Sequence, residues 1–390
     1  MIKKKIPLHE PHFISYSNKY LLNCTRNNWV SSSGSYVDLF EKKMCDLTKS
    51  NSAVAVLNGT IGLQLSLILS QVKHGEEVIV PTITFVATVN AIIHVGANPI
   101  FVDTEETLNI DEEKCIKFIK KKTYFQNNYT YNSKTGKKIK ALFVVHTFGN
   151  AAKFEKLYIL CKKRNIKIIE DAAESIGTKY LSGKFKNKHT GTIGDFGVIS
   201  FNGNKTITTG NGGVILFKNR KLAKRARYLI TQAKDNSIKF IHNDVGYNFK
   251  LSNLSAAMGV AQLEKLKTIL KMKKKVKLNY KKNLSKIKGL KVMRSPDFSI
   301  NNNWLNILEI DSKYYKLNSL KLLNLLNKHG IMARAIWRPN HLQKPYKDFQ
   351  RYNLDTSMKN YKNYLCLPSS PNLSIKNIKF ITNILKKGVN

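Results

Sequence analysis

Long apolar stretches are absent from the sequence. No run of apolar residues approaches the roughly 20 positions that a membrane-spanning helix needs. The first five residues, MIKKK, carry charge but have no apolar signal-peptide core behind them. With 390 residues and 42% hydrophobic content, the chain can bury the cores of roughly two or three domain equivalents. We therefore expect a soluble globular protein that resides in the cytoplasm, without membrane insertion.

Cysteine is scarce and scattered. The five cysteines form no C-x-x-C pair, so the sequence predicts neither a disulfide framework nor a zinc site. His9 and His12 are three positions apart, but no further ligands stand at a spacing that fits a metal site. We therefore expect no metal, and reduced cysteines that serve as packing residues. These cysteines are Cys24, Cys45, Cys115, Cys161 and Cys366.

Acidic residues are few: 25 Asp and Glu stand against 66 Lys and Arg, which gives a net charge of +41. Such a charge ordinarily suggests nucleic acid. The lysines are spread along the chain among many Asn and Ile residues, however, as the codon bias of an AT-rich genome would produce, and no RNA or DNA motif accompanies them. Residues 120–140 are interpreted as a polar insertion and residues 265–282 as an amphipathic helix with a basic, solvated face. We expect no nucleic-acid partner, although a basic field could steer an anionic substrate.

Strand-like runs alternate with helical or loop stretches between residues 52 and 217. This alternation predicts a mostly parallel sheet covered by helices, an α/β fold. A long helix is expected to begin near Asn253, and the rest of the chain fits a smaller α/β domain. We predict a large domain over residues 1–250 and a small C-terminal domain over residues 251–390. The seven predicted strands of the large sheet are 53–57, 77–80, 99–102, 141–145, 166–169, 198–200 and 213–217. In the small domain, the predicted strands are 304–310 and 331–336, and the predicted helices are 317–329 and 375–387.

Lys205 is the candidate catalytic residue. It stands between an apolar strand, residues 198–201, and a flexible glycine run, residues 210–213. This setting suits an amine nucleophile that must swing while its neighbours hold a cofactor. Most lysines of so basic a chain are solvated surface charges, so Lys205 alone is weak evidence.

Two further elements place polar groups where α/β proteins bind ligands. The strand at 166–169 is followed by the acidic pair Glu170 and Asp171, and the carboxyl end of a parallel strand faces the binding crevice. The strand at 53–57 leads through Gly59 into a helix, whose first backbone N–H groups and dipole bind anions. Phe85 offers an aromatic ring at a crevice edge. The alternatives are a helix cap at Asp171, a tight turn at Gly59 and core packing for Phe85.

The order and spacing of the motifs EDAAES, SFNGNK and GYNFK resemble those of the fold-type-I enzymes that use pyridoxal phosphate, and within them the DegT/DnrJ/EryC1/StrS sugar aminotransferase family. The resemblance extends from Ile6 to Pro368. The sequences of four segments resemble most the branch related to legionaminic acid biosynthesis. These segments are residues 29–32, 58–60, 146–149 and 200–205. That branch aminates the 4-keto carbon of a nucleotide-linked 6-deoxy sugar.

The resemblance implies pyridoxal 5'-phosphate as the cofactor and gives roles to the motif residues. Lys205 would hold the cofactor covalently and later move a proton, and Asp171 would pair with the protonated pyridine nitrogen. Gly59, Thr60 and Ser200 would bind the phosphate, Phe85 and Ala173 would cover the two ring faces, and Glu174 would lie near the ring hydroxyl. Without the resemblance, each residue has an ordinary structural explanation. Ser200 could form a hydrogen bond with a backbone group, Ala173 could be a helix residue without a role in a site, and Glu174 could be a surface charge.

The resemblance also implies a homodimer with two shared active sites, because the loop at Asn248 would reach the neighbour's cofactor phosphate. An Asn after Gly-Tyr is otherwise a turn residue. The substrate-side residues would be Trp29, Ser31, Arg334, Trp337 and His341. Arg334 could equally form an ion pair in the small domain, Trp337 could be a packing residue and His341 could lie in a surface loop.

The implied reaction is transfer of an amino group from L-glutamate to the 4-keto carbon of a UDP- or GDP-linked 2-acetamido-4-keto-2,6-dideoxyhexose. Such a product would serve the biosynthesis of a bacterial surface glycan or nonulosonic acid. One alternative is a GDP-4-keto-6-deoxymannose aminotransferase that makes perosamine-type sugars, and another is a basic nucleic-acid-binding or regulatory protein on an enzyme fold. The presence of Lys205 argues against a dehydratase. Lys250, where the family often has Arg, and Asn211, where it commonly has Gly or Glu, leave the substrate detail open, including the nucleotide, the 2-substituent and the configuration of the amine.

Overall fold

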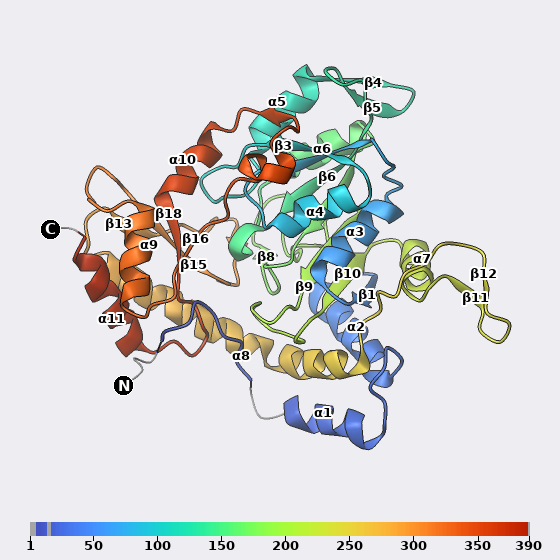
Figure 1. The fold of residues 1–390 in the computed structure, drawn as a ribbon, viewed down its shortest axis with the longest axis horizontal. Coiled ribbons are helices and arrows are strands. Elements are labelled where there is room, and N and C mark those ends of the chain that lie inside the picture. The colour runs from blue at the N-terminus through green and yellow to red at the C-terminus, as the bar shows by residue number, and fades with distance from the viewer. Residues whose placement is uncertain (1–4, 14–16, 389–390) are drawn as a thin grey trace.

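The computed structural model describes residues 5–13 and 17–388. Its centre is an eight-stranded sheet with the strand order β1-β10-β9-β7-β6-β2-β3-β17 (Figure 1). The strands from β9 to β17 pair in parallel, while β10 is antiparallel to both β1 and β9. All seven predicted strands are present, as β1 (Ser52–Val56), β2 (Glu77–Pro81), β3 (Asn98–Val102), β6 (Ile139–Val145), β7 (Lys167–Asp171), β9 (Phe196–Ser200) and β10 (Gly213–Phe217). The sheet has one strand more than predicted, β17 (Arg351–Tyr352), which is contributed by the C-terminal part of the chain.

Helices cover both faces of this sheet. Alternate strand residues belong to two separate apolar clusters: Val78 and Val80 pack with α3, α4 and α7, whereas Ile79 packs with α5 and α6. Successive strand residues point to opposite faces, so these two clusters are the two cores of a three-layer α/β fold. The helices are α3 (Gly59–Leu69), α4 (Val86–His94), α5 (Glu112–Lys121), α6 (Glu155–Lys163) and α7 (Arg220–Ile230).

The C-terminal part contains a second, antiparallel sheet with the order β13-β15-β18-β16. The predicted strand 331–336 contains only two ladder residues, while the two predicted helices are present as α9 and α11, each shortened at one or both ends. The elements are β13 (Leu290–Val292), β15 (Asn306–Ile310), α9 (Ser319–Lys328), β16 (Arg334–Ala335), α10 (Asp355–Asn363), β18 (Tyr364–Leu367) and α11 (Ile375–Lys386).

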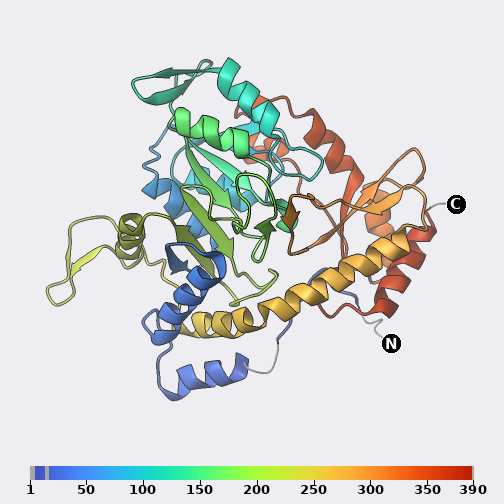
Figure 2. The same cartoon turned by 180° about the vertical axis from the view of Figure 1, so that it is seen from behind.

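Helix α8 (Asn253–Leu284) connects the two parts (Figure 2). It begins at the predicted residue, where the side chain of Ser252 accepts a hydrogen bond from the backbone N–H of Ser255, a typical N-cap. Its first half packs against α1 (Ser17–Arg26) and α2 (Ser35–Thr48), and its second half packs against α11. Since one helix serves both parts, the predicted boundary at residue 250 stays a prediction.

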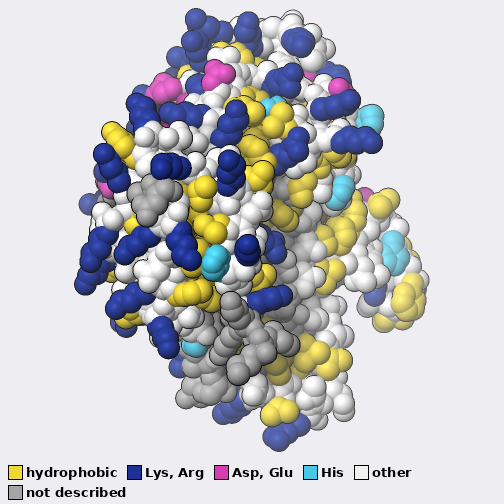
Figure 3. All heavy atoms as spheres, turned by 60° about the vertical axis from the view of Figure 1, so that its left-hand side comes forward, with side chains coloured by type: hydrophobic (Ala, Val, Ile, Leu, Met, Phe, Trp, Pro, Cys, Tyr) yellow, Lys and Arg dark blue, Asp and Glu magenta, His cyan; other side chains and the backbone are white. Residues whose placement is uncertain are grey.

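Two hairpins extend from the body of the molecule (Figures 1 and 2). The predicted polar insertion forms the hairpin of β4 (Thr123–Gln126) and β5 (Tyr129–Asn132), and β11 (Lys234–Asn236) pairs with β12 (Ile241–His242). One further short ladder pairs β8 (Lys179–Tyr180) with β14 (Ser299–Ile300). On the face drawn in Figure 3, Lys and Arg side chains are widely spread and acidic side chains are few. None of the described helices is long and apolar enough to cross a bilayer.

Candidate active site

A cavity of about 370 Å³ opens where the carboxyl ends of β2 and β7 face the C-terminal sheet. This is the edge at which parallel α/β sheets bind ligands. The cavity brings together ten of the residues predicted from the sequence. They are Gly59, Thr60, Phe85, Asp171, Ala173, Glu174, Ser200, Lys205, Arg334 and Trp337.

The amine of Lys205 points into this cavity from the loop after β9. Its Nζ lies 3.3 Å from Oε1 of Glu174 and 4.3 Å from the centre of the Trp304 ring, and the residue is only 8% exposed. The indole Nε1–H of Trp304 donates to the carbonyl oxygen of Asn204 at 2.8 Å, which fixes the loop beside the lysine. Lys205 is therefore a buried amine on a supported loop, as a cavity nucleophile requires.

Asp171 ends β7 and turns its carboxylate into the same cavity. Oδ2 accepts a 2.6 Å hydrogen bond from the hydroxyl of Thr88, and Oδ1 accepts one of 3.1 Å from the backbone N–H of Ala173. Burial raises the pKa of Asp171, while these two hydrogen bonds and the charge of Lys205 oppose that rise. The two donors favour the ionised carboxylate, the form that can hold a protonated ring nitrogen.

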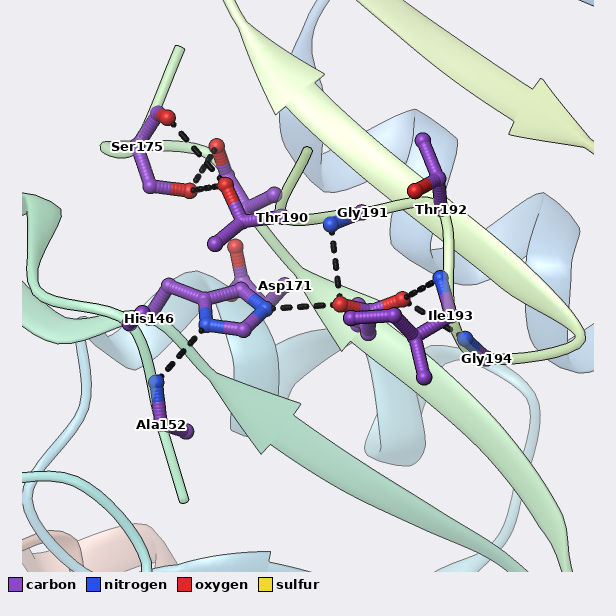
Figure 4. Close-up of polar contacts among 12 residues, drawn as sticks. His146, Ala152, Asp171, Ser175, Thr190, Gly191, Thr192, Ile193 and Gly194 are labelled. Carbon is purple, nitrogen blue, oxygen red and sulfur yellow. Dashed lines mark hydrogen bonds and ion pairs between the residues drawn. The ribbon is translucent and has the colours of Figure 1, made fainter. Parts of the chain in front are cut away.

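Glu170, the neighbour of Asp171 on β7, holds the loop that leads into β9. Its carboxylate accepts hydrogen bonds from the backbone N–H groups of Gly191 (2.8 Å), Ile193 (2.5 Å) and Gly194 (2.6 Å), and from Nε2 of His146 (2.8 Å). Figure 4 shows these donors converging from two sides. They hold the pKa of Glu170 below its usual value, although burial acts in the opposite direction. Since the backbone N–H of Ala152 donates to Nδ1 of His146, the ring proton is on Nε2.

Glu174 is the titratable neighbour of Lys205, with Oε1 3.3 Å from the amine. Burial raises its pKa to about 7, although the charge of Lys205 and the backbone N–H of Phe148, which donates to Oε2 at 2.8 Å, favour the carboxylate. A carboxyl group with a pKa near 7 beside an amine can take up or release a proton at neutral pH.

The N-terminus of α3 supplies the predicted anion-binding groups. The side chain of Asn58 caps the helix by accepting from the backbone N–H of Ile61 at 2.9 Å. A Cβ atom on Gly59 would stand 3.0 Å from Cβ of Ser200, so a larger residue would crowd this close approach of helix and strand. The first turn of α3 and the hydroxyls of Thr60 and Ser200 thus face the cavity with the positive end of the helix dipole.

Aromatic rings form one wall of the cavity. The Trp337 ring stacks on Phe148 with 4.4 Å between ring centres, and Phe85, which is half exposed, lies 6.1 Å from Trp337. Sequence reasoning missed Phe148 and Trp304 as cavity residues. Phe148 lies in residues 146–149, one of the segments that resemble the family, whereas Trp304 lies in no such segment.

Four predicted site residues do not line the cavity of their own chain. Trp29 and Ser31 lie beside the start of α8. Their carbonyl oxygens accept hydrogen bonds from Asn253, the first residue of that helix. His341 is buried with Nδ1 2.7 Å from the hydroxyl of Thr82, and Asn248 forms a backbone bridge with Thr231. Their contacts with ligands stay predictions.

The residues present fit pyridoxal phosphate: a hydrogen-bonded buried carboxylate, a buried lysine and a helix N-terminus with two hydroxyls stand in one cavity. The sequence profile of the DegT/DnrJ/EryC1/StrS aminotransferase family matches residues 13–386. The chain belongs to this family. It is therefore an enzyme, a nucleotide-sugar aminotransferase that depends on pyridoxal phosphate. This finding favours the enzyme over the alternative of a nucleic-acid-binding or regulatory protein.

Relatives in the family cover almost the whole chain. GDP-perosamine synthase of Vibrio cholerae is 33% identical over 387 residues, which are 99% of each chain. EpsN of Bacillus subtilis (strain 168) is 32% identical over 376 residues, 95% of this chain and 92% of EpsN. A solved DegT/DnrJ/EryC1/StrS aminotransferase from Brucella abortus has a TM-score of 0.84 and 25% identity, covering 96% of this chain and 95% of that one. These relatives support the family without singling out a legionaminic acid branch.

Proposed function

We propose that this aminotransferase moves an amino group from L-glutamate to the 4-keto carbon of a nucleotide-linked 6-deoxy sugar, with a UDP- or GDP-linked 2-acetamido-4-keto-2,6-dideoxyhexose as acceptor. L-glutamate becomes 2-oxoglutarate and the keto sugar becomes an amino sugar, so the exchange needs no external oxidant. The observation that supports this most is the placement of Lys205 beside Glu174, in one cavity with the hydrogen-bonded carboxylate of Asp171.

Different residues of the chain would carry out different parts of this amino-group exchange. Pyridoxal phosphate, when bound, supplies a carbon that accepts the amine and a ring that withdraws electrons. Asp171 would hold the proton on the ring nitrogen, and the first turn of α3 would hold the phosphate. Lys205 would move a proton between the donor or acceptor carbon and the cofactor, and Glu174 would exchange protons with Lys205 across 3.3 Å.

A second acceptor is favoured by the relatives. The 33% identity with GDP-perosamine synthase of Vibrio cholerae over nearly the whole chain favours GDP-4-keto-6-deoxymannose. Both candidates present a 4-keto carbon on a nucleotide-linked 6-deoxy sugar, so they require the same chemistry at Lys205. They differ at the 2-substituent, which the cavity wall formed by Phe85 and Trp337 would contact.

The active unit would be a homodimer whose two sites are shared. Supporting this, Asn248 lies outside the cavity of its own chain, six positions after the end of the projecting β11–β12 hairpin. That hairpin exposes Ile238 (87%) and Phe240 (72%) in the single chain. A symmetric partner that covers these apolar side chains would remove them from water.

The test is to incubate the purified enzyme with L-glutamate and a panel of UDP- and GDP-linked 4-keto-6-deoxy sugars, with and without a 2-acetamido group, and to identify the product by mass and NMR. We expect one acceptor to give a 4-amino sugar and an equal amount of 2-oxoglutarate, with ping-pong kinetics. If every acceptor remains unchanged while the cofactor is bound, the proposed reaction is wrong.

A further inference from the structure

Lys273 is a buried lysine behind the cavity wall. It lies on α8, is 1% exposed, and its Nζ is 3.0 Å from Nε2 of His9 and 2.9 Å from the carbonyl oxygen of Ser369. Within residues 5–13 and 17–388, no carboxylate bonds to it. A lysine is almost never fully buried without a carboxylate partner, so this one needs an explanation.

His9 connects Lys273 to the cavity. The segment before it is fixed on the C-terminal part, because Ile6 exchanges backbone hydrogen bonds with Gly330 and Met332, and the N–H of Ser369 donates to the carbonyl oxygen of Leu8 at 2.6 Å. These bonds place His9 in the cavity wall, along with Met332 and Arg334. The imidazole ring of His9 therefore lies between the amine of Lys273 and the cavity.

The hydrogen bond from Lys273 determines the protonation of His9. Burial and the charges of Lys273 and Lys205 hold the pKa of His9 well below its usual value, so the ring is neutral. Up to about pH 7, where Lys273 is an ammonium group and can only donate to Nε2, the single ring proton is on Nδ1. Nδ1 is buried and has no hydrogen-bond partner among the described residues. A buried N–H donor without a partner is rare in folded proteins.

Positive charge at this end of the cavity is not balanced by the cavity's own carboxylates. Asp171 accepts from Thr88 and Ala173, and Glu174 accepts from Lys205 and Phe148. Arg334 forms no ion pair with any described residue. Arg334, and Lys273 acting through His9, therefore give this wall a capacity for an anion that the chain itself does not fill.

We propose that His9 and Arg334 bind a carboxylate of the amino donor, and that Lys273 is the positioning residue that holds His9 with its Nδ1 proton directed to that carboxylate. This inference rests on the proposed function, which supplies the amino-acid donor. A carboxylate fits better than a sugar-linked phosphate for two reasons. The first turn of α3 already offers a phosphate site elsewhere in the cavity, and the donor must lie close to Lys205, which lines the same cavity as His9.

The test measures binding of glutarate, a dicarboxylate without an amine, to the cofactor-loaded enzyme by calorimetry. Lys273→Met removes the charge but keeps the length of the side chain. Lys277→Met is the matched control, because Lys277 is one turn along α8, is partly buried and bonds to Ser295 instead of a residue of this cavity. We expect Lys273→Met and His9→Leu to weaken glutarate binding about tenfold or more, and Lys277→Met to change it less than about twofold.

Kinetics and a second ligand exclude a merely structural effect. With Lys273→Met, the KM for L-glutamate should rise about tenfold while the KM for the nucleotide sugar and the binding of UDP stay unchanged. His9→Gln, whose amide can accept from Lys273 and still donate, should retain more glutarate affinity than His9→Leu. His9→Gln and His9→Leu provide the same comparison if Lys273→Met does not fold.

The inference is overturned if the wild type does not bind glutarate, if Lys273→Met and His9→Leu bind it normally, or if UDP binding falls in place of glutarate binding. The last result would assign this wall to the nucleotide phosphates. Calorimetry needs no turnover, so the two proposals fail separately. Glutarate binding that depends on Lys273 in an enzyme that aminates no sugar would contradict only the proposed function.

Discussion

The hydroxyl of Thr88 donates a 2.6 Å hydrogen bond to Oδ2 of Asp171, across 83 positions of sequence. Thr88 lies in the first turn of α4, and Thr84, just before that helix, bonds to its hydroxyl at 2.8 Å. The loop after β2 thus orients the carboxylate at the end of β7. The hydrogen bond therefore connects the ends of β2 and β7, which lie on either side of β6 in the sheet.

Thr88→Val should therefore lower turnover about tenfold, because a hydrogen bond to a charged group contributes ~1.5–3 kcal/mol. Valine keeps the shape of threonine, so stability should change little. Thr84→Val is the control: it removes a hydroxyl from the same loop that does not touch Asp171, and it should cost less. Steady-state rates of the three enzymes provide the measurement. Equal rates for Thr88→Val and wild type would show that this hydrogen bond does not matter.

Lys205→Ala should abolish amino transfer and the visible absorption of the purified protein, because no other described lysine lines the cavity. The wild type should be yellow and lose that colour when L-glutamate is added. Lys205→Arg keeps a positive charge near Glu174 but cannot form the covalent bond, and it should also be inactive. Normal turnover by Lys205→Ala, measured as release of 2-oxoglutarate, would remove this lysine from its role.

Strand positions and motif residues could be predicted from the sequence, and contacts between distant residues could not. Buried parallel strands such as β2 and β6 contain continuous apolar runs, which are visible in any sequence. Strand β17 has two residues and no such run. The bonds Thr88–Asp171, His146–Glu170 and His9–Lys273 join residues 83, 24 and 264 positions apart. Periodicity carries no information about such pairs. The sequence therefore shows His9 only as a histidine three positions from His12, and it does not predict that His9 lines the cavity.

The stability of Lys273→Met relative to wild type should depend on pH. Burial lowers the pKa of Lys273 from 10.5 to about 7, so between these values the unfolded chain binds a proton that the folded chain does not. Wild-type stability therefore rises with pH across this window and falls as the pH drops towards 7. The methionine variant lacks this pH-dependent change in stability, which is on the order of 5 kcal/mol over the whole window.

Urea denaturation at pH 6 and pH 10 measures the effect. The stability difference between Lys273→Met and wild type should shift in favour of wild type by several kcal/mol as the pH rises. Lys277→Met should show a smaller shift that begins near pH 8, since burial lowers the pKa of Lys277 only to about 8. A pH-independent difference for Lys273→Met would mean that Lys273 titrates normally in the folded protein.

Glu170→Gln should destabilise the fold by about 2–4 kcal/mol, because three backbone N–H groups and His146 donate to this buried carboxylate. Glutamine keeps the volume but presents an NH₂ group to donors. Thermal unfolding measures the loss, and Glu113→Gln, at an exposed ion pair with Lys156, should leave the melting temperature nearly unchanged. A Glu170→Gln protein as stable as wild type would mean that the loop at 191–194 does not depend on this charge.

In the proposed shared site, Asn248 of each chain would serve the cofactor of the other chain. A Lys205→Ala chain and an Asn248→Ala chain should form heterodimers in which one site carries both lesions and the other carries neither. If Asn248 serves the partner's cofactor, mixing the two weak variants should restore activity, up to about half of the wild-type value per heterodimer. Native mass spectrometry checks that heterodimers form, and the Asn248→Ala homodimer must itself be impaired. If heterodimers are present and no activity returns, Asn248 acts within its own subunit, because only a residue contributed across the interface can be supplied by the other chain.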